Sequence, residues 1–477
     1  MQRISRRRTL AWLGAASLAS SGCNLPAKVA GPAPRNVMLF IADGASWGTW
    51  QMASFYEHGA LGRQPYDRFS VKLGMSTQPL NTGNRPTHDS TPLHGYDPTR
   101  AWDATPVPGR LGLRARGFAG YDYLRSDVTD SAAAGTAMAS GVKTYNSAIN
   151  HDNQGRPLPY VTQRAKAQGK ATGVLSTVPF SHATPATFAA QQATRNDYAA
   201  ISEQMLRNPA VDLIMGAGHP LFDANGRARE EADFRWMSAA AWQSLQGTHS
   251  PRRMIQSGAE FQALAAGQLR VDGPLLGLLP VHDTLQASRV ATVAGADAQR
   301  PSGTAFNPGL PSLAVMTRGA LQVLGHAPRG LFMMVEGGAV DWMAHANNTG
   351  RIIEEQIDFN HAVQAAVDWV EAHSNWRETL IVVATDHGNG LPLGPESDRV
   401  PFQPVQNRGA GVLPGVLWHH GNHTRENTLL WAHGAGAQTL YAEVQAVDPA
   451  LAQRMGHGSD GRTIGNHGLG RALMRLV

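Results

Sequence analysis

Short runs of apolar and β-branched residues recur along the chain, and each ends in a polar or glycine-rich turn. The clearest runs are Asn36–Asp43, Ala171–Thr177, Val211–Gly216, Leu331–Glu336 and Thr379–Thr385. Continuous apolar runs of this length predict strands that are buried on both faces. Between the runs lie helical patterns, the clearest from Ile352 to Ala372, where apolar residues recur near the 3.6-residue period. The alternation predicts an α/β fold: a three-layer α/β/α sandwich around a large, mostly parallel sheet.

Three acidic residues stand at the ends of predicted strands: Asp43, Glu336 and Asp386. In parallel sheets the carboxyl ends of the strands form one edge, beyond which ligands bind. Three carboxylates at that edge would repel one another unless cations lay between them. The pattern therefore indicates a site for several metal ions, although each acid taken alone could cap a turn.

Asp341 and His345 are four residues apart in a predicted helix, so both side chains lie on one helix face and can chelate one ion. The same spacing is also common on solvated helix faces. Asp386 and His387 form a second acid–imidazole pair, and His423 adds another imidazole. This set holds oxygen and nitrogen ligands without a thiolate, which favours zinc through the imidazoles and magnesium through oxygen ligands alone.

Ser131 lies in the segment Asp127–Thr144, at the start of a predicted helix. A serine hydroxyl is a weak nucleophile that must be activated, here by metal ions. The alternative is helix capping, a role that Asp130 or Ser131 would fill. Because no Gly-x-Ser-x-Gly elbow surrounds Ser131, the nucleophile hypothesis depends on the metal ligands.

These motifs resemble those of the alkaline phosphatases, and Asp127–Thr144 is similar to the segment that carries the family's nucleophile. The resemblance implies two zinc sites and one magnesium site, with Ser131 as the nucleophile and Arg195 as the phosphate-holding cation. The implied ligands are Asp43, Asp386 and His387 for the first zinc ion, Asp341, His345 and His423 for the second, and Asp43, Glu336 and Thr184 for magnesium. The implied reaction is hydrolysis of phosphate monoesters through a covalent phosphoserine, which releases inorganic phosphate.

Two further residues, His182 and Trp342, resemble those of a bacterial subgroup of the family that carries His and Trp at positions that tune the metal site. Both could equally be packing residues. The chain departs from many members after His387, where Gly388–Leu391 replaces a Glu-Thr-Gly-Gly sequence, but no ligand is affected. The resemblance also implies a homodimer.

Two other functions stay open. A phosphodiesterase or sulfatase of the same superfamily would share most zinc ligands, but a diesterase typically lacks the magnesium pocket and the arginine, which correspond here to Thr184, Glu336 and Arg195. A surface lipoprotein that binds phosphate or metal without turnover would be expected to lack Ser131 or a zinc ligand. Since none of these residues is missing, small-molecule phosphomonoesters are the expected substrates.

The N-terminus carries a basic segment, Arg3–Leu10, followed by an apolar stretch to Ser20, which predicts an export signal over residues 1–22. The pair Arg6-Arg7 resembles the twin-arginine type of signal. The single cysteine, Cys23, lies where a lipoprotein is processed, although Ser20 departs from the usual Leu-like residue three positions earlier. Lipid attachment and plain cleavage both stay open. We expect an exported, periplasmic protein, either free or anchored to the membrane by a lipid.

The formal net charge of +5 falls to +1 once the four arginines of the signal are set aside, so the charge does not support nucleic-acid binding. One cysteine cannot form an internal disulfide in an oxidising compartment. The expected organisation is an export signal over 1–22, a linker over 23–35 and a single catalytic domain over 36–477, with insertions near 81–120, 218–312 and 388–420. We expect the insertions to lie over the sheet, and the last of them to rim the active site.

Overall fold

Five neighbouring parallel strands form the centre of the protein, in a computed structural model that describes residues 33–89, 95–107, 117–455 and 458–477. They are β1 (Asn36–Ala42), β3 (Ala171–Pro179), β4 (Leu213–Ala217), β7 (Leu331–Gly337) and β8 (Thr379–Ala384). Their order in space is β8-β1-β7-β3-β4. All five coincide with the apolar runs of the sequence, which confirms those predictions. Almost all of their residues are buried, as expected for strands covered on both faces.

The predicted export signal, Cys23 and most of the predicted linker fall within residues 1–32, outside the described part of the chain. Residues 90–94 and 108–116 are also outside it, so only part of the segment near 81–120 is described. In the residues that are described, no helix is both long enough and apolar enough to cross a membrane.

Six further strands widen the sheet to eleven. They are β2 (Val71–Ser76), β13 (Thr428–Gly434), β14 (Val444–Val447) and β15 (Arg462–Gly465) on the side of β8, and β6 (Leu275–Leu278) and β5 (Arg253–Ile255) beyond β4. The β13 strand runs antiparallel to β2 and β8, and β14 runs antiparallel to β15, whereas the other pairs are parallel. The sheet is therefore mixed but mostly parallel, as predicted.

The segment 218–312, which we expected to lie over the sheet, contains both β5 and β6. It therefore supplies part of the sheet itself. These two strands are only three and four residues long. Apolar runs of that length cannot be told from loop segments by periodicity, so their place in the sheet is decided by pairing: β6 pairs with β4, and β5 pairs with β6.

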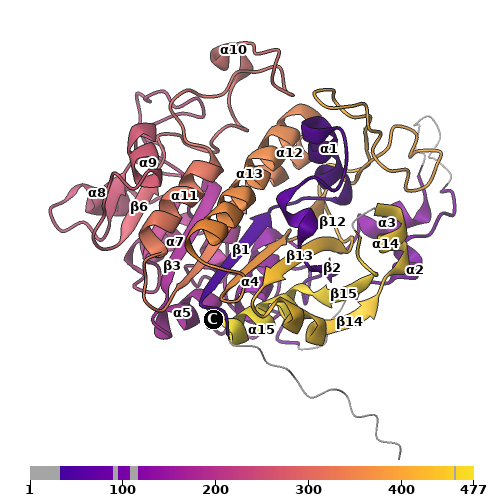
Figure 1. The fold of residues 1–477 in the computed structure, drawn as a ribbon, viewed down its shortest axis with the longest axis horizontal. Helices are drawn as coiled ribbons and strands as arrows, with labels where there is room; N and C mark the ends of the chain where they lie inside the picture. Colours follow the sequence, from indigo (N-terminus) through magenta and orange to yellow (C-terminus); the bar gives the residue numbers. More distant parts are fainter. Residues whose placement is uncertain (1–32, 90–94, 108–116, 456–457) are drawn as a thin grey trace, which may run out of the picture.

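Helices cover both faces of the sheet, which confirms the three-layer prediction (Figure 1). Alternate residues of β1 point to opposite layers: Met38 and Phe40 belong to one apolar core, and Val37 and Leu39 belong to the other. The first layer holds α1 (Trp47–His58), α9 (Gly258–Ala265), α11 (Leu313–Leu324) and α13 (Thr349–His373), and the second holds α4 (Ser131–Ser140), α5 (Val161–Ala167), α7 (Tyr198–Arg207) and α15 (Asn466–Leu476). The α13 helix contains the predicted pattern from Ile352 to Ala372.

Strand register brings the candidate acids to one edge of the sheet. Ile41, two residues before Asp43, is paired with Glu336 of β7, and Ser176 of β3 is paired with the same glutamate from the other side. Asp386 follows β8 by two residues. The carboxyl ends of β1, β3, β7 and β8 therefore meet at one edge, where the candidate site lies.

Candidate functional site

Four candidate residues meet beyond β1 and β8. Asp43 follows β1 directly, and His387 places its Nε2 atom 3.5 Å from Asp43 Oδ1 and 3.2 Å from Asp386 Oδ2. The Oγ atom of Ser131 lies 3.2 Å from the same His387 nitrogen. All four side chains are buried. The two aspartates and the histidine are close enough to hold one metal ion, with the serine hydroxyl beside it.

A glycine makes the turn after β1 possible. Gly44 has a φ of 67°, and a Cβ atom at this position would lie 2.6 Å from Asp341 Oδ1. Its backbone N–H donates a hydrogen bond of 3.1 Å to Asp386 Oδ1. Only glycine allows this left-handed backbone to approach both acids so closely.

The second group consists of Asp341, His345 and His423. The first two lie four residues apart on α12 (Ala339–His345), as the sequence predicts, and His423 comes from β12 (His423–Thr424). The Nε2 atoms of His345 and His423 lie 3.4 Å from the two carboxylate oxygens of Asp341 and 3.2 Å from each other. The rings of His423 and His387 stack with centroids 3.6 Å apart, so the two groups are immediate neighbours.

A third group contains oxygen ligands only. Thr184, on α6 (Ala183–Thr187), places its Oγ1 atom 3.4 Å from Asp43 Oδ2, and Glu336 lies beside both residues. All three are fully buried. Asp43 therefore stands between this group and the first one, in the bridging position that the resemblance implies.

Several carboxylate oxygens at this edge lack a hydrogen-bond donor among the described residues: Asp43 Oδ1, Glu336 Oε1 and Asp386 Oδ2. Leaving buried carboxylate oxygens without donors is costly. Burial raises the pKa of Glu336 to about 8 and, together with the nearby Asp341 carboxylate, raises the pKa of Asp386 to about 6. Burial and neighbouring carboxylates likewise raise the pKa of Asp43 well above its usual range. Divalent cations would satisfy the free oxygens and remove this repulsion.

The imidazoles are suited to ligate metal. Burial lowers the pKa of His387 well below its usual range, which keeps the ring neutral with a free nitrogen lone pair. Burial alone would raise the pKa of Asp341, but His423 and His345 beside it hold that pKa well below its usual range. His423 Nδ1 lies 2.7 Å from the Thr129 carbonyl, so a ring N–H there directs Nε2 toward Asp341. The donor sets fit zinc at the two histidine-containing groups and magnesium at the oxygen-only group.

The opposite wall of the site carries Arg195. Its Nη1 atom donates a hydrogen bond of 3.1 Å to Asp130 Oδ2, and its Nη2 atom lies 3.3 Å from His182 Nε2. Burial, aided by Arg195, lowers the pKa of His182 to about 3, so the ring is neutral. The His182 and Trp342 rings meet edge to face with centroids 5.7 Å apart. Both residues therefore lie at the site, as the resemblance implies.

These walls enclose a cleft of about 480 Å³. Its lining residues are Ser131, His182, Arg195, Asp341, Trp342, His345, Asn422 and His423. The structure thus brings every predicted site residue to one place, within the cleft or directly beneath it. The segment 388–420, expected at the rim, supplies none of the lining residues.

Asp130, and not Ser131, caps the helix. Asp130 is the N-cap of α4, where its Oδ1 atom accepts a 2.9 Å hydrogen bond from the Ala133 N–H, and Ser131 is the first helical residue. The capping role that the sequence left open therefore falls to Asp130, which also holds Arg195. The Ser131 hydroxyl takes no part in capping and lies beside His387, where Ser131 lines the cleft.

Sequence reasoning missed two residues that hold metal-ligand candidates in place. Asn389 donates a 2.7 Å hydrogen bond from Nδ2 to Asp341 Oδ1, and Ser176 donates one from Oγ to Glu336. Asn389 lies in the segment that departs from many alkaline phosphatases, and this departure was the only signal for it. Nothing in the sequence around Ser176 singles it out.

Comparisons with known proteins agree with this geometry. Residues 119–408 match the family model described as alkaline phosphatase. The chain is 31% identical over 269 residues to alkaline phosphatase 4 of Bacillus subtilis (strain 168), a match that covers 55% of this chain and only 50%, about half, of that relative. It is 30% identical over 359 residues to the alkaline phosphatase of Escherichia coli (strain K12), covering 67% of this chain and 72% of the relative.

The fold is also found among solved structures. The alkaline phosphatase of the Antarctic bacterium TAB5 superposes with a TM-score of 0.59 at 21% identity, covering 93% of this chain and 98% of that one. At this level of identity the likeness concerns the fold alone. A variant of the same TAB5 enzyme, with a TM-score of 0.58 at 20% identity and coverage of 94% and 98%, has Mg bound in its M3 site.

Proposed function

Because the chain belongs to the alkaline phosphatase family, we propose that it hydrolyses phosphate monoesters and releases inorganic phosphate. The observation that carries this proposal is the position of Ser131. Its hydroxyl lies at the first turn of α4, beside His387, in a cleft that Arg195 also lines. We further propose that residues 36–477 form one catalytic domain.

The metal ions are part of this proposal. Asp43, Asp386 and His387 would hold one zinc ion. Asp341, His345 and His423 would hold a second one. Asp43, Glu336 and Thr184 would hold a magnesium ion. Bound there, the ions would supply positive charge that lowers the pKa of the serine hydroxyl and stabilises negative charge on the attacking and departing oxygens. The oxygen-only donor set of Asp43, Glu336 and Thr184 supports the magnesium assignment, and a TAB5 alkaline phosphatase variant of the same fold has Mg bound in its M3 site.

Ser131 is the proposed nucleophile. The N-terminus of the ten-residue helix α4 carries a partial positive charge, which favours the deprotonated Oγ atom. The Ser131 hydroxyl gives up its proton to solvent as Oγ forms a bond to phosphorus, and the bond between phosphorus and the ester oxygen breaks on the opposite side. We propose that this oxygen departs toward Asp341 and His423, where it takes up a proton from solvent and leaves as the alcohol. Water then attacks phosphorus from that side, the Ser131 Oγ–phosphorus bond breaks, and Oγ regains a proton as phosphate is released.

Arg195 would bind the phosphoryl group throughout. Its planar guanidinium can donate two parallel hydrogen bonds to two nonbridging oxygens, and the ion pair with Asp130 fixes its orientation. His182 packs against Trp342 and, being neutral, contacts Arg195 without competing for the anion. Arg195 lines the cleft, and Thr184 and Glu336 lie beneath it. The presence of all three residues at one site favours a monoesterase over the diesterase and sulfatase alternatives.

The test is substitution of Ser131 by Ala, with Ser140→Ala at the other end of α4 as the matched control. Loss of the nucleophile should reduce kcat on a phosphomonoester by at least about 1,000-fold while leaving bound zinc unchanged. Ser140→Ala should behave like the wild type, because the Ser140 hydroxyl makes only local hydrogen bonds, to the Thr136 carbonyl oxygen and from the Val142 N–H. Undiminished turnover in Ser131→Ala would disprove the nucleophile assignment.

Substrate class needs a separate measurement. Rates of the wild-type protein on a phosphomonoester, a phosphodiester and a sulfate ester should rank the monoester first. A faster diester or sulfate reaction would replace the proposed function with that of a related hydrolase. Metal analysis of the same sample should give more than one ion per chain, and a single ion would contradict the three-site arrangement.

We also propose that residues 1–22 direct export and that the mature protein is periplasmic. Cys23 is the candidate site of lipid attachment. We further propose that the protein forms a homodimer. Support comes from the sequence of the N-terminus and from family resemblance. Mass spectrometry of the mature N-terminus would distinguish a lipidated Cys23 from plain cleavage, and light scattering would give the oligomeric state.

A further inference from the structure

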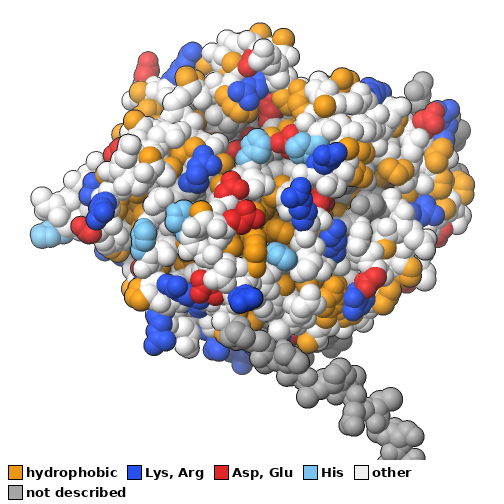
Figure 2. Space-filling view, in the orientation of Figure 1, with side chains coloured by type: hydrophobic (Ala, Val, Ile, Leu, Met, Phe, Trp, Pro, Cys, Tyr) orange, Lys and Arg blue, Asp and Glu red, His pale blue; other side chains and the backbone are white. Residues whose placement is uncertain are grey.

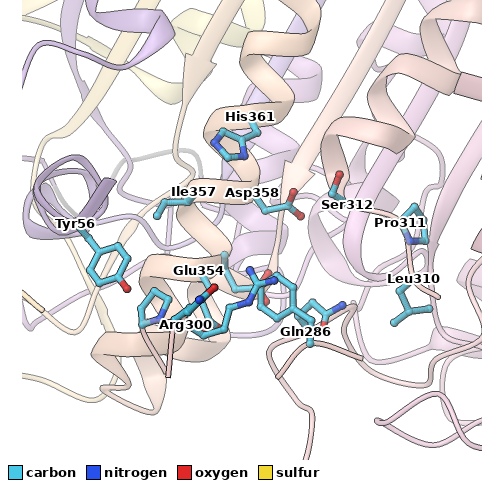
Figure 3. Close-up of a pocket in the computed structure, with 14 residues that line it drawn as sticks. Tyr56, Gln286, Arg300, Leu310, Pro311, Ser312, Glu354, Ile357, Asp358 and His361 are labelled. Atoms are coloured by element: carbon cyan, nitrogen blue, oxygen red, sulfur yellow. The ribbon is translucent and has the colours of Figure 1, made fainter. Parts of the chain in front are cut away.

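A second cavity lies apart from the cleft at Ser131, and the two have no lining residue in common. It has a volume of about 340 Å³ and lies between α1, α13 and the loop that precedes α11. Figure 3 shows Tyr56 of α1 on one side, Leu310 and Pro311 on the other, and Ile357 and Asp358 of α13 between them. The space-filling view shows acidic side chains on this face, over α13 (Figure 2).

Three carboxyl groups from α13 line the cavity, and two of them have partners. Glu354 accepts hydrogen bonds from Arg289 at 2.7 Å and from Ser302 at 2.6 Å. Asp358 accepts a 3.0 Å hydrogen bond from the Leu313 N–H at the start of α11. Both carboxyl groups are therefore accounted for by the fold.

Glu355 is different. It is only 5% exposed and lines the cavity, yet no described residue donates a hydrogen bond to its carboxyl group. The Glu355 oxygens are not among the fully enclosed side-chain oxygens that lack a partner, so they open onto the cavity, where a bound donor can reach them. The described residues around the cavity therefore supply no hydrogen-bond donor to the Glu355 carboxyl group.

The chemistry of the walls narrows the class of ligand. The two cationic side chains of the lining are already engaged: Arg300 lies 3.4 Å from Asp297 and stacks on Phe306, and His361 lies 2.7 Å from Glu57. An anion would meet acidic groups without a free cation. The carboxyl groups also do not converge as metal ligands, since the ligand groups of three or more found in the described residues all lie at the Ser131 site.

We propose that this cavity binds a small organic amine, whose ammonium group donates hydrogen bonds to Glu355 and whose carbon chain packs against Phe306, Leu310 and Ile357. An ammonium group carries three hydrogen-bond donors and a positive charge. It therefore supplies a donor to the Glu355 carboxyl group and a charge that the neighbouring carboxylates attract. The volume is at the lower end of the range for small-molecule sites, which suits a short chain. The proposal does not rest on the phosphatase activity.

The protonation of Glu355 gives the proposal a distinctive signature. Burial, together with Asp358 and Glu354, raises the pKa of Glu355 to about 8, while Arg289 and Arg351 act in the opposite direction. Burial likewise raises the pKa of Asp358 to about 6. At pH 7 Glu355 is therefore largely protonated, whereas an ammonium ion binds the carboxylate. Binding of an amine at pH 7 should release a proton from Glu355.

The test is calorimetric titration of the full-length wild-type protein with n-butylamine at pH 7, in two buffers of different ionisation enthalpy. We expect binding with proton release. Glu355→Gln should weaken binding by about 10- to 150-fold, as expected for loss of a hydrogen bond to a charged group, and should abolish the proton release. Glu371→Gln is the matched control, because Glu371 is an exposed residue of the same helix outside the cavity.

n-Butanol, which has the same chain but no charge, should bind at least tenfold more weakly than n-butylamine. Leu310→Trp, which fills the cavity from the loop, should abolish binding. This second variant tests the site independently, should Glu355→Gln fail to fold. The proposal is overturned if n-butylamine does not bind, if Glu355→Gln binds it as well as the wild type, or if n-butanol binds equally well.

Discussion

Replacing Asn389 by Ala should weaken zinc binding without touching any metal ligand. Asn389 is fully buried, and its Nδ2 atom donates hydrogen bonds of 2.7 Å to Asp341 Oδ1 and 3.3 Å to the Asp341 carbonyl oxygen. A hydrogen bond to a charged acceptor contributes about 1.5–3 kcal/mol, which corresponds to about 10- to 150-fold in an equilibrium constant. Losses of about 10- to 100-fold in metal affinity are typical when such supporting residues are removed. We therefore expect zinc at Asp341, His345 and His423 to bind about 10- to 100-fold more weakly.

The assay is competition for zinc between the protein and a chromogenic chelator, which resolves the weaker of the two zinc sites. Asn389→Asp, which keeps the shape but replaces the donor with a second carboxylate, should be impaired at least as much. Asn375→Ala, in the exposed turn before β8, serves as the control. Unfolding by urea in the presence of a chelator separates a loss of zinc affinity from a loss of stability of the metal-free protein. Zinc affinity within twofold of the wild type in Asn389→Ala would refute the reasoning.

Three further predictions concern stability and magnesium. Arg289→Met should lower the free energy of unfolding, measured by urea denaturation, by about 3–5 kcal/mol, because it leaves the Glu354 carboxylate buried without the guanidinium 2.7 Å away. Adding Glu354→Gln to this variant should restore most of the lost stability. Burial raises the pKa of Glu426 from 4.5 to about 7, so the folded protein binds a proton at Glu426 more tightly than the unfolded chain does. The contribution of this protonation to the free energy of unfolding is complete at acid pH and is lost as the pH rises through 7. Glu426→Gln should therefore be more stable than the wild type at pH 8 with a chelator present but not at pH 4, and equal stability at both pH values would contradict the assignment. Ser176→Ala should raise the magnesium concentration needed for full activity by about 10- to 100-fold at fixed zinc, and an unchanged requirement would mean that Glu336 is positioned by other contacts.

The predictable part of the fold is the part whose signal is local. The strands β1, β3, β4, β7 and β8 are continuous apolar runs because each is covered by helices on both faces, and α13 repeats its apolar positions because one side faces the sheet. The outer strands carry no such signal. The β2 strand contains Lys72 and Gly74, and its place between β15 and β13 depends on pairing with β13, more than 350 residues later in the chain.

The ligand candidates could be predicted because metal chemistry restricts residue type as well as position. Asp341 and His345 are paired by helical spacing, and Asp43 and Asp386 are marked by the strands that they follow. Resemblance to a known family then assigned the remaining residues to the two zinc sites, the magnesium site and the phosphate contact. The geometry confirms that these side chains come together, and their roles in catalysis remain the proposal tested at Ser131.

The sequence alone therefore determined the central strands, the layer arrangement and the set of candidate ligands, because residue spacing and residue type are local properties that can be read from short segments. Only the tertiary structure decided what holds those ligands. Asn389 reaches Asp341 across 48 positions and Ser176 reaches Glu336 across 160, and neither pairing leaves a local trace. The cavity at Glu355 likewise exists only where α1, α13 and a distant loop pack together. A hydrogen bond between distant segments depends on where the packed sheet places two atoms, and no periodicity of either segment encodes that distance.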